Sequence, residues 1–204
     1  MFSIHAFQKD APIRVSPLSV SRYHRLGGGD IDRAILYDVL MPQLVKQNRL
    51  SQFELSFEDK KKFIEPPLLS VAEALKISLC SEVARLKEFD KYDSADKATL
   101  LVKLTGRHEC KLKDRVVELQ SPTLSAAQFE RLLAPFLDQD LLFARESEYL
   151  LTLSIFAPLQ DALTRTGLDR SAIDYCLMVG GSSLIPQVRE EVERFFTGGR
   201  LYAR

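Results

Sequence analysis

The sequence has no excess of charge of either sign. Its 28 lysine and arginine residues are balanced by 28 aspartate and glutamate residues, which gives a formal net charge of +0 at pH 7. A protein that holds nucleic acid or an anionic membrane by bulk electrostatics carries a basic surplus. The composition therefore argues against both kinds of partner. The basic run Lys60–Lys62 follows two acidic residues and is expected to be a solvated face.

Cysteine and histidine are scarce, with 3 residues of each. Cys80, Cys110 and Cys176 are odd in number, widely spaced and set in apolar contexts. This pattern is typical of buried reduced thiols rather than of disulfides. The histidines show no ligand spacing with the cysteines, so we predict no metal site.

Long apolar runs are missing too. No stretch approaches the roughly 20 apolar residues that a membrane-spanning helix needs, and residues 1–5 lack the basic and apolar regions of a signal peptide. We therefore expect a cytoplasmic protein. With 46% hydrophobic residues among 204, the chain can bury the core of one domain or of two small lobes.

Glycine, in contrast, marks a place where a strand pattern changes into a helix pattern. The apolar run Tyr175–Val179 is predicted to be a buried strand, and apolar residues recur at helical spacing after Pro186. Gly180 and Gly181 lie between them. Glycine lets the backbone turn sharply and approach a ligand, and free N–H groups at a helix start attract an anion. A plain tight turn is the alternative interpretation.

A second glycine turn, Gly27–Gly29, lies near the other end of the chain. Residues 13–23 before it alternate like a strand, and a helix that Pro42 kinks or shortens is predicted after it. Asp30 or Asp32 is expected to cap the start of this helix, where a carboxylate meets free amides and the positive end of the helix dipole.

The segment Ser70–Ser81 is predicted to form a helix that continues to about Leu86. Glu73 and Lys76 are three residues apart in it and therefore share one face. Exposed pairs of this kind are common and weak, so a solvated Glu73–Lys76 ion pair is one interpretation.

The rest of the chain has a mixed pattern of helices and short strands. A polar stretch is expected to stop at Pro66–Pro67, and Ser125 with Gln128 is predicted to form a capping box at the start of an apolar helix. The further expected elements are a strand at 98–105, a turn at 106–108, one or two strands at 110–119, and a helix from about 146 to 166 that ends at Gly167.

In order and spacing, these motifs resemble the second half of the ATPase domain of the seventy-kilodalton heat-shock protein family, the DnaK-type chaperones of the actin-like ATPase superfamily. The resemblance extends over nearly the whole chain. The segments that carry it are Leu26–Asp32, Glu73–Ser81, Leu124–Leu133 and Ile173–Phe196.

The resemblance implies a mixed α+β and α/β fold. This fold is a partial actin-like (ribonuclease H-like) ATPase lobe with an inserted subdomain of helices and antiparallel sheet. Residues 1–26 would be a strand segment of the lower lobe, and residues 27–119 would be the inserted subdomain of the upper lobe. Residues 120–204 would return to the lower lobe and end before its last strand and helix.

The resemblance also implies an adenosine-binding site. Glu73 and Lys76 would hold the ribose hydroxyls, and Gly28 would approach the ribose or the phosphate edge. Ile77 and Leu184 would form the walls of the adenine slot. The residues implied to meet the phosphate and the base are Gly180, Gly181 and Ser182.

Two positions of this implied site depart from the family's pattern. Leu184 replaces an arginine that stacks on the adenine in most members, and such a contact contributes about 0.5–2 kcal/mol. Cys80 replaces a serine, which exchanges a good hydrogen-bonding group for a poor one. Both changes indicate a divergent member.

By the same resemblance, the phosphate loops, the catalytic lysine and the metal-holding aspartates would come from parts outside these residues. We therefore expect a fragment that has no catalytic residue, does not hydrolyse ATP alone, and binds ATP or ADP with Mg²⁺ in its full-length parent. The parent's partners would be an unfolded peptide, a J-domain co-chaperone and a nucleotide-exchange factor. A pseudo-ATPase that serves as a partner-docking module and an actin-like filament protein are the alternatives.

Overall fold

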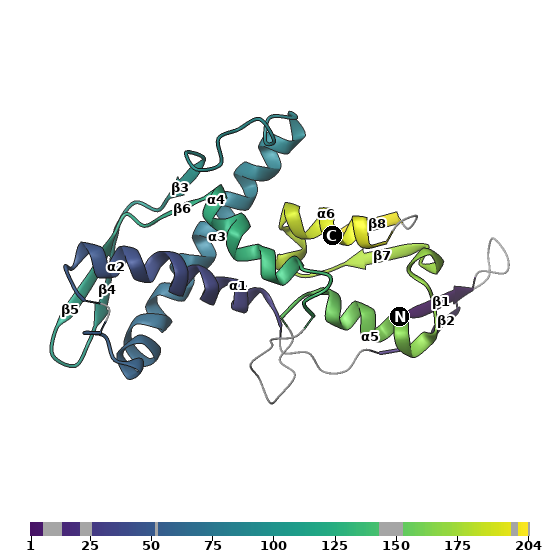
Figure 1. The fold of residues 1–204 in the computed structure, drawn as a ribbon, viewed down its shortest axis with the longest axis horizontal. Helices are drawn as coiled ribbons and strands as arrows, with labels where there is room; N and C mark the ends of the chain where they lie inside the picture. Colours follow the sequence, from purple (N-terminus) through teal and green to yellow (C-terminus); the bar gives the residue numbers. More distant parts are fainter. Residues whose placement is uncertain (6–13, 21–25, 52, 143–152, 197–199, 204) are drawn as a thin grey trace. The chain divides into compact units, whose positions relative to one another are not determined.

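The computed structural model describes residues 1–5, 14–20, 26–51, 53–142, 153–196 and 200–203 (Figure 1). The chain divides into two compact units. Unit 1 comprises Met1–Leu26, Pro135–Ser183 and Gln187–Arg204, and unit 2 comprises Gly27–Ala134 and Leu184–Pro186. In the part of the chain that is described, no helix is both long and apolar enough to cross a membrane.

Unit 2 opens with the helix predicted after the first glycine turn. It consists of α1 (Gly28–Ile35), a π-helical turn (Leu36–Leu40) and α2 (Met41–Gln47). Pro42 lies in the first turn of α2, where an α-helix needs no N–H donor. The turn before it has i→i+5 hydrogen bonds, so the Pro42 ring does not face the carbonyl with which it would clash in a regular α-helix. The predicted irregularity at Pro42 therefore takes the form of a π turn, and the helical run continues to Gln47.

A second π-helical turn corrects the expectation that Pro66–Pro67 stops the preceding segment. This turn covers Asp59–Ile64 and leads directly into α3 (Glu65–Glu88), whose first turn contains both prolines. The first positions of a helix tolerate proline because their N–H groups have no partner one turn back. The helix predicted from residue 70 is confirmed, but it begins earlier than expected.

Short antiparallel strand pairs complete unit 2, in agreement with the predicted mixed fold. Strand β4 (Arg107–Lys111) pairs with β5 (Val116–Gln120), and β3 (Leu101–Lys103) pairs with β6 (Thr123–Ser125). The strand predicted at 98–105 is therefore shorter than expected.

A backbone irregularity separates the two strand pairs. Gly106 has φ +134° and Ser121 has φ +46°, and the Ser121 N–H donates to the Gly106 carbonyl at 2.8 Å. Glycine adopts such a conformation without the steric cost of a Cβ. The turn predicted at 106–108 is confined to Gly106, because Arg107 and His108 already pair with β5.

Helix α4 (Ala126–Leu133) begins with the predicted capping box. The Gln128 N–H donates to Ser125 Oγ at 3.2 Å, and the Ser125 N–H donates to Gln128 Oε1 at 3.0 Å. Both β6 and α4 belong to unit 2, although the resemblance implied a boundary after residue 119. The core of unit 2 consists of large buried apolar side chains: Ile35, Leu36, Leu40, Leu44, Ile64, Leu68, Leu75, Leu79, Leu119 and Phe129.

Unit 1 contains two small sheets. Strands β1 (Phe2–His5) and β2 (Arg14–Pro17) are antiparallel, whereas β7 (Tyr175–Met178) and β8 (Arg200–Ala203) are parallel. Of the strand predicted at 13–23, Arg14–Pro17 is confirmed. Residues 18–20 are not in a strand, and residue 13 and residues 21–23 lie outside the described part.

Strand β8 is an element that the sequence patterns did not predict. Arg200–Ala203 pair in parallel with β7, and helix α6 (Pro186–Phe195) lies between the two strands in the sequence. Parallel neighbours require such a crossover connection, because a short turn can join only antiparallel strands.

The prediction of a buried strand at 175–179 is right about the strand and wrong about its burial. Tyr175, Leu177 and Val179 alternate along the chain and therefore share one face, and they are 59%, 66% and 71% exposed. Strands of a parallel sheet become fully buried only when helices cover both faces. In unit 1 as described, that face of β7 is open to solvent.

Helix α5 (Phe156–Thr166) is shorter than predicted. Residues 153–155 are not helical, and residues 146–152 of the predicted helix lie outside the described residues. The helix ends at Gly167, whose φ of +66° is the expected left-handed cap. Phe156 of α5 stacks on Phe195 of α6 with ring centroids 4.8 Å apart, and this contact lies in the core of unit 1.

We expect replacement of Ser125 by alanine to lower the free energy of unfolding of unit 2 by about 1 kcal/mol, because the Gln128 N–H loses its acceptor. Urea denaturation and amide exchange at Gln128 measure the effect. Ser81→Ala is the matched control. The Ser81 hydroxyl only donates back to the Ile77 carbonyl within α3, a contact that does not stabilise a helix. Equal effects of the two substitutions would contradict the cap.

Candidate functional site

Helices α1 and α3 pack against each other in unit 2 and bring together several of the predicted site residues. Gly28 is the first residue of α1, and Glu73, Lys76, Ile77 and Cys80 follow one another along α3. The candidate site of unit 2 is therefore the contact between these two helices.

A buried ion pair joins the two helices. Lys76 Nζ lies 2.7 Å from Asp32 Oδ1, and each side chain is only 10% exposed. Burial raises the pKa of the Asp32 carboxyl above its usual value, and the Lys76 ammonium opposes this shift. The interpretation of Glu73 and Lys76 as a solvated pair is therefore wrong, since Lys76 is buried against α1 while Glu73 is exposed.

The two aspartates after the first glycine turn have different roles. Asp30 caps α1 as predicted, because its Oδ2 accepts the Gly27 N–H at 2.8 Å. Asp32 faces α3 and pairs with Lys76 instead of capping the helix. Two residues along an α-helix correspond to a rotation of about 200°, which separates the two carboxylates onto different faces.

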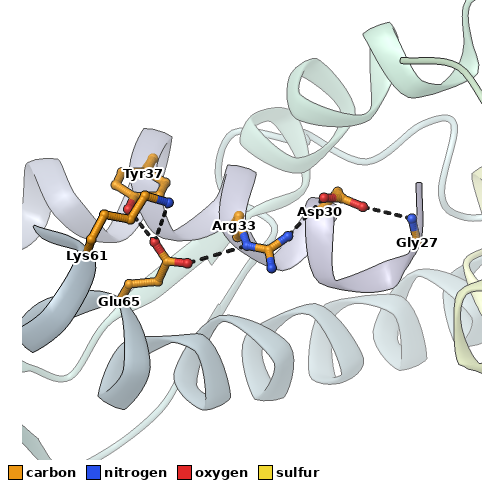
Figure 2. Close-up of polar contacts among 6 residues, drawn as sticks. All are labelled: Gly27, Asp30, Arg33, Tyr37, Lys61 and Glu65. Carbon is orange, nitrogen blue, oxygen red and sulfur yellow. Dashed lines mark hydrogen bonds and ion pairs between the residues drawn. The ribbon is translucent and has the colours of Figure 1, made fainter. Parts of the chain in front are cut away.

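A cluster around Glu65, formed with Tyr37, Lys61 and Arg33, adds a second link between α1 and α3 (Figure 2). The Glu65 side chain is 12% exposed. It accepts hydrogen bonds from the Tyr37 hydroxyl at 2.5 Å, from Lys61 Nζ at 2.7 Å and from Arg33 Nε at 3.4 Å. Burial works to raise the Glu65 pKa, but the hydrogen bonds from Lys61 and Tyr37 outweigh it and hold the pKa below its usual value.

Figure 2 shows that this cluster reaches the glycine turn. Arg33 donates to Asp30 Oδ1 at 2.9 Å, and Asp30 in turn holds the Gly27 amide. A continuous series of polar contacts therefore runs from the start of α3 to the turn before Gly28. Arg33 and Asp30 are 49% and 37% exposed, and exposed ion pairs add little stability. We infer that these contacts mainly orient the turn.

Ile77 and Cys80 occupy opposite environments on α3. Ile77 is 56% exposed, whereas Cys80 is buried. Burial raises the pKa of the Cys80 thiol to about 11, so this thiol is protonated at neutral pH and is not a nucleophile. All three cysteines are free; Cys80 and Cys110 are buried as predicted, whereas Cys176 is half-buried.

In unit 1, the glycine pair follows β7 as predicted, but it does not lead directly into a helix. A 3₁₀ turn covers Gly181–Leu184, and α6 begins only at Pro186. The Ser183 N–H and hydroxyl both donate to the Gly180 carbonyl, at 3.0 and 2.6 Å. Free amides at the start of α6 therefore do not adjoin the glycines.

The two glycines of this turn differ in backbone conformation. Gly180 has φ +92°, a conformation that side chains rarely adopt. Gly181 has no such φ, and no described atom lies within 4 Å of a Cβ built on it. Its own structure thus gives no reason for glycine at 181, whereas close approach of a ligand would. Ser182 is half-buried, and Leu184 is 58% exposed.

The glycine turn at Gly180–Gly181 lies in the part of the chain that matches a known family. Residues 121–201 match the model of the Hsp70 protein family. The resemblance is confirmed over this segment, which contains Leu124–Leu133 and Ile173–Phe196. The Hsp70 match implies an actin-like ATPase fold, in agreement with the mixed α+β architecture. Leu26–Asp32 and Glu73–Ser81 precede the matched segment, so the functional roles of their residues stay predictions.

Sequence reasoning named Asp32 and Lys76 but not the contact between them, because they are distant in the sequence and no local spacing connects them. Glu65 has no local signal either, since in the sequence it is only the end of a polar stretch before two prolines. Arg33 could have been found, since it lies three residues after Asp30 and therefore on the same helix face.

We expect Lys76→Met to lower the free energy of unfolding by about 3–5 kcal/mol, because it leaves the Asp32 carboxylate buried without a partner. The double variant Asp32→Leu/Lys76→Met removes both charges and should recover most of this loss. Urea denaturation of both proteins measures the difference. A double variant as unstable as the single one would show that packing, not charge, carries the effect.

The stability of Lys76→Met should also depend on pH. Without the ammonium, burial and the nearby Glu73 carboxylate raise the Asp32 pKa and only Arg33 opposes them, so the pKa in the folded state lies further above the unfolded value. The folded state then binds a proton more readily than the unfolded state. The deficit relative to wild type should shrink as pH falls from neutral and grow again as pH rises, and denaturation across a pH series checks this sign.

Proposed function

We propose that this chain supplies an adenosine-binding surface of an Hsp70-type chaperone ATPase. The observation that carries the proposal is the Hsp70 match over residues 121–201, which encloses the glycine turn and the start of α6. Hsp70 proteins are ATP-binding chaperones, and Gly180, Gly181 and Ser182 stand at the position that the resemblance gives to phosphate and base contacts.

The helix pair of unit 2 has the groups that a ribose requires. A vicinal diol needs hydrogen-bond donors and acceptors side by side. Lys76 carries three N–H donors and directs at least one of them to Asp32, which fixes the ammonium in place. Glu73, one turn earlier on α3, is exposed and offers an acceptor. We assign the ribose to Lys76 and Glu73, with Gly28 at the edge of the same surface.

Ile77 and Leu184 are proposed to contact the adenine. Both are large apolar side chains that are more than half exposed, at 56% and 58%, and a flat base needs apolar walls of this kind. A leucine lacks the cation–π contact of the family's arginine, worth about 0.5–2 kcal/mol. The affinity for adenine should therefore be a few-fold to about thirtyfold lower than in a member with arginine. Cys80 lies behind this surface as a buried, protonated thiol.

Hydrolysis is not assigned to these residues. ATP hydrolysis depends on magnesium and on groups that position the phosphates. Among the described residues, no group of three or more histidine, cysteine, aspartate or glutamate side chains is placed to hold a metal ion. By the resemblance, the Mg²⁺ that accompanies ATP or ADP would be held by other parts of the full-length parent. The parent's unfolded-peptide client, J-domain co-chaperone and exchange factor are proposals on the same basis.

Leu184 and Cys80 also support a second candidate, a pseudo-ATPase whose fold serves as a docking module for a partner. Calorimetric titration of Mg·ADP into the full-length parent separates the two functions. Heat of binding supports the ATPase, and no heat at millimolar nucleotide supports the pseudo-ATPase. An actin-like filament protein would instead show light scattering that rises with concentration in the presence of ATP.

We expect the 204-residue chain to bind Mg·ADP with a dissociation constant of about 1 mM or weaker, because most phosphate contacts come from elsewhere. In an NMR titration, Glu73→Ala should weaken this binding by about tenfold, since a hydrogen bond to a charged group is lost. Glu88→Ala, at the other end of α3, is the matched control. Micromolar binding by the wild-type chain would contradict the assignment of the phosphate contacts.

Gly181→Ala should leave the fold unchanged, because nothing described lies within 4 Å of the added Cβ. It should weaken Mg·ADP binding by about tenfold if a ligand approaches the backbone there. Gly180→Ala should instead destabilise unit 1, because alanine is strained at φ +92°. Thermal melts and the same NMR titration measure both effects. Unchanged binding by a folded Gly181→Ala variant would argue for a plain tight turn.

A further inference from the structure

Strands β5 and β6 belong to different strand pairs and follow each other in the chain; their outer backbone is called the β5–β6 edge below. This edge is hydrogen-bonded to side chains of a helix instead of to another strand. Helix α2 lies beside β5 (Figure 1). Three amide side chains of this helical run, Gln43, Gln47 and Asn48, each make two hydrogen bonds to the backbone of a single residue on the strands. Each amide thus replaces one peptide group of a neighbouring strand.

The geometry of these contacts is the same at each position. Gln43 Nε2 donates to the Thr123 carbonyl at 2.8 Å, and its Oε1 accepts the Thr123 N–H at 3.1 Å. The corresponding distances are 3.0 and 2.7 Å between Gln47 and Gln120. They are 2.7 and 3.0 Å between Asn48 and Glu118. A side-chain amide has the donor and acceptor of a peptide group, so it can complete a strand edge.

The bonded strand residues are those whose backbone faces outward from the strand pair. Glu118 and Gln120 are two apart on β5, as the strand repeat requires. The next bonded residue is Thr123, because the left-handed Ser121 and the following Pro122 interrupt the repeat. The run from residue 43 to 48 is antiparallel to the strands. Glutamine is longer than asparagine, which allows neighbouring Gln47 and Asn48 to reach different strand residues.

We propose that Gln43, Gln47 and Asn48 form an edge seal that keeps the β5–β6 edge from pairing with the same edge of a second copy of the chain. An unpaired strand edge is a template for association. This edge has the features of one that would self-associate: Val116, Val117 and Leu119 give it strand propensity, and Val116 is 51% exposed. In a two-fold contact between two copies, the Glu118 residues of both edges would come close. Each Glu118 is already paired with Arg107 of its own chain, so their charges would not oppose the contact.

The seal uses none of the residues proposed for the nucleotide site and does not depend on it. Gln43, Gln47 and Asn48 lie on the helical run after the π turn, and an i→i+5 turn offsets the face of the residues that follow it. The π turn at Leu36–Leu40 therefore lets α1 face α3 while α2 presents its amides to the strands.

The test is the double variant Gln43→Ala/Gln47→Ala in the 204-residue chain. In dilute solution, the Gln120 and Thr123 amides should exchange with solvent about tenfold faster, because each has lost its acceptor. At high concentration the mass from light scattering should double, and exchange at these two amides should slow again as a second copy fills the edge. Lys46→Ala, an exposed change on the same helix, should alter neither measurement.

Faster exchange without any rise in mass would overturn the proposal, since the opened edge would then not pair with a second copy. Unchanged exchange would overturn it as well, and so would a rise in mass without renewed protection of the two amides. If the double variant does not fold, Gln47→Glu keeps the test decisive. Glutamate still accepts the Gln120 N–H but can no longer donate to the Gln120 carbonyl. Dimerisation of folded Gln47→Glu supports the seal, and a monomer at every concentration contradicts it.

Discussion

Unit 2 depends on the contact between α1 and α3, and the buried Asp32–Lys76 pair is the part of that contact with the largest electrostatic consequence. Each charge is acceptable inside the unit only because the other is 2.7 Å away. The pair therefore fixes the position of the Lys76 ammonium more than it adds stability. The Glu65 cluster and the Arg33–Asp30 contact extend the same connection to the turn before Gly28 (Figure 2).

Two π-helical turns make this arrangement possible in a chain that has prolines within its helical runs. Each turn lies directly before a proline-containing first turn, at Met41–Pro42 and at Glu65–Pro67. Proline is tolerated in such a first turn, so both helical runs continue through it. The amides of α2 reach β5 and β6, and Glu65 lies beside Tyr37 and Lys61.

The glycine turn in unit 1 has a different physical basis, which is backbone conformation rather than charge. Gly180 is fixed by its left-handed φ and by the two hydrogen bonds from Ser183 to its carbonyl. Gly181 leaves space beside it that no described side chain fills. The open face of β7 next to this turn shows that apolar residues of a predicted core strand can stay exposed when the sheet is small.

Local sequence patterns account for the features that depend on neighbours along the chain. These include the capping box at Ser125, the left-handed cap at Gly167, the helix that contains Glu73 and Lys76, and the glycine turns, because a few adjacent residues decide each of them. Long-range packing sets the remaining features: the partner of Lys76, the three donors to Glu65, the continuation of the helical run through Pro66–Pro67, and the pairing of β8 with β7. The energy of each of these depends on residues far away in the sequence, and no local spacing carries that information.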